Sequence, residues 1–157
     1  MNKNLAVSIF PVNVNGSITD PFESEREIEI TSDKLTYILT DELKIEVTFK
    51  NHLPKDIAIV NDGSAVPFFI LEKKIGDVWE EVYFPICYNL IPSFVQPTEL
   101  KMNWELISPI TIYTNRIKVD IIVGEYRLYF DLMEKGSNKM VQDKYLYSNV
   151  FKIIGEI

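Results

Sequence analysis

Apolar and polar residues alternate with a period of two along much of the chain. The clearest stretch is residues 43–50, where apolar side chains occupy every odd position and polar ones every even position. Successive side chains of a strand point to opposite faces, so this pattern predicts a strand with one face in the core. The same alternation predicts further strands over 100–106, 117–123, 126–132 and 145–154.

Shorter apolar runs add weaker strand candidates. They cover residues 28–30, 35–39, 57–60, 68–73 and 78–82. The last two runs are separated by Ile75-Gly76-Asp77, which predicts a hairpin turn. No window of helical length shows a 3.6-residue period. Seven to nine short strands with frequent turn signals predict an all-β fold, an antiparallel β-sandwich.

The first 24 residues have a different character from the rest of the chain. Asn13, Asn15 and Gly16 interrupt this segment, and Pro21 closes it. We expect an N-terminal extension over 1–24, which could supply one added edge strand, and a single domain over 25–157.

The order of features from Leu35 onward resembles that of bacterial immunoglobulin-like domains. The resemblance spans about 120 of the 157 residues and rests on six segments: Val47-Thr48-Phe49-Lys50-Asn51, Phe69-Ile70-Leu71-Glu72-Lys73, Gly76-Asp77-Val78-Trp79, Glu99-Leu100-Lys101, Gly124-Glu125-Tyr126-Arg127-Leu128 and Tyr147-Ser148-Asn149-Val150-Phe151. It implies an immunoglobulin-like sandwich in which Tyr126 takes the place of the tyrosine-corner residue. Leu128 stands where an antibody domain carries cysteine, so apolar packing would replace that disulfide.

The chain is also distantly similar to the bacterial intracellular proteinase inhibitors, which share the sandwich. Members of that family have a second tryptophan and a serine after the hairpin tryptophan. Here Glu80, Glu81 and Val82 follow Trp79 instead. This difference disfavours protease inhibition.

Charge and composition exclude several classes of function. The net charge is −7 and the only arginines are Arg26, Arg116 and Arg127. Nucleic acids and anionic membrane surfaces both require a basic footprint, so neither is an expected partner. No apolar run reaches the ~18 residues that a membrane span requires. As written the chain has no leader, which predicts a cytoplasmic protein, whereas removal of an export signal would leave the same sequence.

The titratable residues give no catalytic or metal motif. The single histidine, His52, and the single cysteine, Cys87, cannot form a multi-histidine or His/Cys zinc site. We expect His52 in an exposed turn and Cys87 in a buried apolar setting. Glu23, Glu25, Glu27 and Glu29 alternate with other residues and predict a solvated strand edge. We therefore expect no enzyme activity, no cofactor and no metal.

Segment 83–97 is the most unusual part of the chain. It combines four aromatic residues and three prolines with no charge. One interpretation is that it crosses between the sheets and closes the edge of the sandwich. The other is a partner-binding loop in which Tyr88, Pro92 and Phe94 are exposed anchors.

The leading hypothesis is a non-enzymatic protein-binding module, by analogy a bacterial envelope or surface accessory domain. The alternative is a cytoplasmic inhibitor or immunity-type protein, whose acidic charge would speed its encounter with a basic enzyme. A third hypothesis is a hydrolase with an unrecognised carboxylate site, which requires a concave pocket with convergent polar groups.

Overall fold

The computed structural model describes residues 27–62, 66–84, 97–136 and 139–156. Within these ranges the chain is all-β. It forms eleven strands in three sheets, together with two 3-10 turns, η2 (Thr114–Arg116) and η3 (Asp143–Tyr145). The described part contains no α-helix. The number of strands exceeds the expected seven to nine because several are only three residues long.

The first sheet has three antiparallel strands in the order β1-β3-β8. Its strands are β1 (Ile28–Ser32), β3 (Glu42–Asn51) and β8 (Glu105–Tyr113). The alternation over residues 43–50 places one side of β3 in the core, as predicted. Leu43, Ile45, Val47 and Phe49 are each at most 3% exposed.

The second sheet has five strands in the order β2-β11-β9-β5-β6. Its strands are β2 (Thr36–Ile38), β11 (Phe151–Ile154), β9 (Gly124–Phe130), β5 (Phe69–Ile75) and β6 (Val78–Tyr83). All neighbours are antiparallel except β2 and β11, which run parallel. The hairpin predicted at residues 75–77 joins β5 to β6, and Gly76 supplies the positive φ of 63°.

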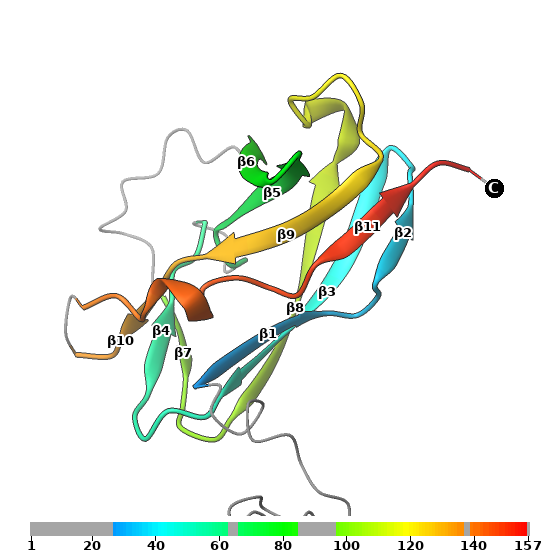
Figure 1. The fold of residues 1–157 in the computed structure, drawn as a ribbon. Helices are drawn as coiled ribbons and strands as arrows, with labels where there is room; N and C mark the ends of the chain where they lie inside the picture. The colour runs from blue at the N-terminus through cyan, green and yellow to red at the C-terminus, as the bar shows by residue number, and fades with distance from the viewer. Residues whose placement is uncertain (1–26, 63–65, 85–96, 137–138, 157) are drawn as a thin grey trace, which may run out of the picture.

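The two larger sheets lie face to face, as Figure 1 shows where β9 and β11 cross in front of β3 and β8. The core fills the space between them. Phe49 of β3 and Phe130 of β9 are fully buried, and their ring centroids are 4.9 Å apart in an edge-to-face arrangement.

The third sheet is small and lies at one side of the molecule, with β4 between β10 and β7 (Figure 1). Its strands are β10 (Leu132–Glu134), β4 (Ile57–Ile59) and β7 (Thr98–Leu100). All of its pairs are antiparallel.

Two predicted strands are wrong, and a third, over residues 145–154, is a strand only from Phe151 to Ile154. Residues 117–123 alternate in sequence but form an irregular connection between η2 and β9, with a bend at residues 119–120. No neighbouring strand pairs with this connection among the described residues. Residues 100–106 are not one strand either. β7 ends at Leu100, the chain turns over 101–104, and β8 begins at Glu105 in another sheet.

Candidate functional site

The turn over residues 101–104, hereafter the 101–104 turn, is held by main-chain hydrogen bonds. The Trp104 amide donates to the Lys101 carbonyl over 3.0 Å, which closes the turn. The Asn103 amide donates to the Asn51 carbonyl over 2.8 Å, and the Asn51 amide donates to the Trp104 carbonyl over 3.1 Å. Asn103 has a φ of 62°, a left-handed conformation that asparagine adopts more readily than most residues.

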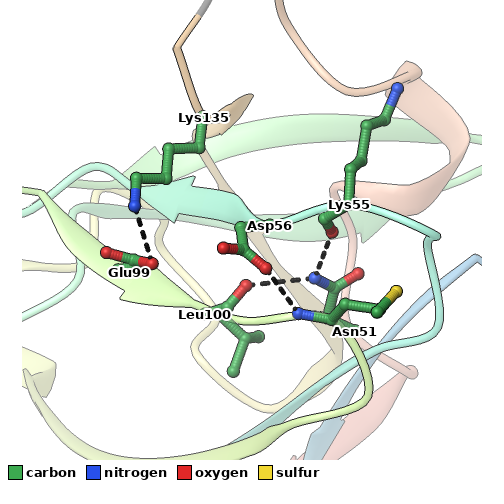
Figure 2. A network of polar contacts seen from close by, with 7 residues as sticks. Asn51, Lys55, Asp56, Glu99, Leu100 and Lys135 are labelled. Carbon is green, nitrogen blue, oxygen red and sulfur yellow. Dashed lines mark hydrogen bonds and ion pairs between the residues drawn. The ribbon is translucent and has the colours of Figure 1, made fainter.

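The side chain of Asn51 ties this turn to the interior. Asn51 is 1% exposed and lies at the end of β3. Its Nδ2 donates to the carbonyls of Lys55 (2.9 Å) and Leu100 (3.0 Å), and its Oδ1 accepts from the Leu53 amide (3.0 Å). Figure 2 shows the amide between the Lys55 and Leu100 carbonyls. One buried side chain thus joins β3, the 51–55 loop and the end of β7.

Asp56 holds the turn from a second direction. Its Oδ1 accepts from the Met102 amide over 2.9 Å, and its carbonyl accepts from the Lys135 amide over 3.1 Å. Lys135 also donates to Glu99 over 2.8 Å (Figure 2), and this hydrogen bond raises the pKa of the Lys135 ammonium. These contacts connect the backbone of the turn to the small sheet.

The fixed turn presents two large apolar side chains to solvent. Trp104 is 57% exposed and Met102 is 46% exposed. The Lys101 ammonium lies 4.8 Å from the centre of the Trp104 ring, a cation–π distance. Tryptophan and methionine are residue types enriched at protein interfaces.

Several charged side chains near the turn form ion pairs with one another. Lys55 donates to Glu134 over 2.5 Å, and this hydrogen bond lowers the pKa of Glu134. His52 is exposed, as expected, and its Nε2 lies 2.9 Å from Oε2 of Glu29. Glu29 is therefore half-buried against His52, while Glu27 is exposed. Glu23 and Glu25, the other members of the acidic series, lie outside the described residues.

The binding residues predicted from the sequence are not placed by the structure. Tyr88, Pro92 and Phe94 lie outside the described residues, as does Cys87. At the start of the same segment, Tyr83 is 2% exposed and Phe84 is 42% exposed.

The sequence pattern does not predict that Met102 and Trp104 are surface residues. Their alternation with Lys101 and Asn103 predicts a strand face directed into the core. The one signal of a turn is Asn103, because asparagine favours turns and is depleted in strands.

The described ranges give no support for a metal site or for a membrane-spanning helix. They contain no group of three or more His, Cys, Asp or Glu side chains placed to hold a metal ion. No helix in these ranges is long and apolar enough to cross a membrane.

Comparison with known proteins gives only distant structural likenesses. No family model matches the chain, and no curated protein matches it. A β-glucosidase, EmGH1 from Erythrobacter marinus, is 10% identical with a TM-score of 0.40, over 80% of this chain and 15% of that one. The DNA glycosylase AlkC from Pseudomonas fluorescens is 8% identical with a TM-score of 0.36, over 81% of this chain and 30% of that one.

The sporulation control protein Spo0M from Bacillus subtilis is 13% identical with a TM-score of 0.36, over 83% of this chain and 49% of that one. The chain therefore spans less than half the length of each of these proteins. Likenesses at this level do not indicate a function.

Proposed function

We propose that this chain is a non-enzymatic protein-binding module with an immunoglobulin-like β-sandwich, and that it binds its partner through the 101–104 turn. The observation that carries the proposal is a tryptophan that is 57% exposed on a turn whose backbone is hydrogen-bonded to the interior. A soluble domain usually exposes large apolar side chains singly, whereas Trp104 and Met102 are grouped.

The immunoglobulin-like part of the proposal is supported by the order of the strands. The first two strands divide between the two large sheets, since β1 pairs with β3 and β2 pairs in parallel with the last strand, β11. The Tyr126 hydroxyl donates to the carbonyl of Ile122, four residues upstream. A tyrosine at the start of the penultimate long strand makes this bond in immunoglobulin domains.

The energetics favour binding through a fixed turn. Tryptophan is among the residues most often found to dominate the affinity of an interface, and losing such a residue removes about 2 kcal/mol or more. Ordering a loop on binding opposes affinity. Because the backbone of the 101–104 turn is already bonded to Asn51 and Asp56, that ordering penalty is small here.

The experiment begins with the isolation of the partner by capture on the full chain. The dissociation constant of the purified pair is then measured for Trp104→Ala and for Leu35→Ala. Leu35 is a matched control because it is 69% exposed and lies just before β2, away from the turn. We expect Trp104→Ala to weaken binding by about 30-fold, the equivalent of 2 kcal/mol. Equal affinities of the two variants would refute the proposal.

A further inference from the structure

The end of the molecule opposite the 101–104 turn also carries exposed aliphatic side chains. In Figure 1 the turn between β7 and β8 is at the bottom, and the connection from β8 to β9 is at the top. The exposed fractions are 66% for Ile121, 59% for Val78, 43% for Ile75 and 41% for Val123. We call these four residues the aliphatic end.

Two segments distant in sequence form this end. Ile75 and Val78 face each other across the β5–β6 hairpin, and Ile121 and Val123 belong to the connection that leads into β9. The Lys73 ammonium, two residues before Ile75, donates to the Ile121 carbonyl. The Lys118 amide donates to the Val82 carbonyl over 2.8 Å, so the connection lies along the hairpin.

The connection is fixed by two buried side chains. Lys73 is 8% exposed and Tyr126 is fully buried, and they bond to successive carbonyls, those of Ile121 and Ile122. No described carboxylate pairs with Lys73. Burying an ammonium group costs free energy unless the group is hydrogen-bonded. The bond from Lys73 holds the backbone of the connection at Ile121, and the side chains of Ile121 and Val123 are exposed.

The border of the aliphatic end is acidic. Asp77 lies in the hairpin turn, Asp120 in the connection, and Glu80 lies opposite Lys73 in the strand register. All three are exposed, and none forms an ion pair with another described residue. The three carboxylates outnumber the unpaired exposed lysines near them. Lys74 lies 4.0 Å from Glu125, and Lys118, which lies 5.0 Å from the centre of the Phe84 ring, keeps its positive charge.

The exposed aliphatic side chains and the carboxylates around them together indicate which kind of partner this end would bind. An anionic lipid surface would be repelled by the three carboxylates, which are part of a chain whose net charge is −7. A second copy docking end to end would bring the same carboxylates against each other. A protein surface with an apolar centre bordered by lysine or arginine satisfies both the aliphatic centre and the acidic border.

We infer that the aliphatic end is a second interaction surface, specific for a protein surface with an apolar centre bordered by lysine or arginine. This surface is separate from the 101–104 turn and does not depend on its proposed role. The module would then bind one partner through the apolar 101–104 turn and a second, positively charged partner through the aliphatic end.

The test uses a designed amphipathic helical peptide of leucine and lysine, with one apolar face bordered by lysines, as the probe. The ¹⁵N-labelled full chain is titrated with this peptide at low salt, and amide shifts locate the contact. The variant of the acidic border, Asp77→Asn/Glu80→Gln/Asp120→Asn, is called the rim variant. It is compared with a control, Glu27→Gln/Glu42→Gln/Glu46→Gln. The control removes the same number of exposed carboxylates elsewhere.

We expect amide shifts concentrated in residues 73–80 and 118–125. We also expect the rim variant to bind at least tenfold more weakly and the control less than twofold more weakly. Vesicles containing phosphatidylserine should not bind. The inference is overturned by equal losses in the two triple variants, by shifts spread over the surface or centred on the 101–104 turn, by the absence of peptide binding, or by vesicle binding.

Discussion

The two ends of the molecule fix exposed apolar side chains in chemically different ways. At the 101–104 turn a neutral amide, Asn51, bonds only to main-chain groups, and the nearby ions are paired. At the aliphatic end an ammonium and a phenol, Lys73 and Tyr126, hold the loop, and the bordering carboxylates form no ion pair with another described residue. We therefore expect salt to weaken binding at the second end more than at the first.

Removal of the Asn51 amide should produce the largest effect on stability. Asn51→Ala removes the partner of the buried Leu100 carbonyl, the buried Leu53 amide and the partly buried Lys55 carbonyl. Each buried group left without a partner costs about 1–3 kcal/mol unless water enters. We expect the free energy of unfolding to fall by about 3 kcal/mol in urea denaturation. The control Asn115→Ala, at an exposed asparagine of η2, should change it by less than about 0.5 kcal/mol. Similar values for both variants would mean that water replaces the amide.

A methyl group at Gly124 should disturb the other end. Its φ is 152°, and an added Cβ would lie 2.8 Å from Cε of Lys73. We expect Gly124→Ala to destabilise the protein by about 2 kcal/mol in the same assay, because backbone strain and the clash with Lys73 add. Gly155→Ala is the control, since nothing lies within 4 Å of its position and its φ is ordinary. An unchanged Gly124→Ala variant would show that Lys73 is free to move.

The phenol of Tyr126 should make the aliphatic end sensitive to alkali. Burial raises the pKa of Tyr126 to about 12, above the value near 10 of an unfolded tyrosine. The neutral form is favoured in the folded state, so its contribution is complete below pH 10 and is lost as the pH rises towards 12. Tyr37, whose pKa is also raised by burial and by its bond to Asp33, acts in the same direction.

We expect Tyr126→Phe to lower stability by about 1 kcal/mol at pH 7 and to flatten its decline between pH 10 and 12. Tyr113→Phe, at a tyrosine that is 42% exposed, is the control and should preserve the wild-type slope. Parallel pH curves for Tyr126→Phe and the wild type would contradict the assignment.

The smallest expected effect on stability is at Trp104. Its ring is mostly in solvent, so Trp104→Ala should change the free energy of unfolding by no more than about 0.5 kcal/mol. Thermal and urea denaturation both measure this. A loss of about 2 kcal/mol would make Trp104 a structural residue and remove it from the proposed site.

The all-β fold follows from the sequence where alternation and pairing agree. β3 and β9 alternate and also lie between two neighbouring strands, so their apolar sides are buried as predicted. Residues 117–123 alternate equally well, but there the carbonyls of Ile121 and Ile122 bond to side chains and not to a strand. Alternation alone therefore does not establish a strand, because it does not reveal what pairs with the chain.

The candidate site is harder to predict for the same reason. The alternation predicts that Trp104 and Met102 point into the core, whereas both are exposed. They lie on a turn in which Asn103 has a left-handed backbone conformation. The contacts that fix the turn come from Asn51 and Asp56, about 50 positions earlier. Contacts of this range depend on the complete topology and leave no local signal.

Tryptophan fluorescence tests the central claim, binding through the 101–104 turn, most directly. The chain has two tryptophans, Trp79 and Trp104, so Trp79→Phe leaves Trp104 as the only indole. In the free protein we predict strong acrylamide quenching of Trp104. Addition of the isolated partner should protect the indole and shift its emission to shorter wavelength. A complex in which Trp104 is quenched as strongly as in the free protein would contradict the account.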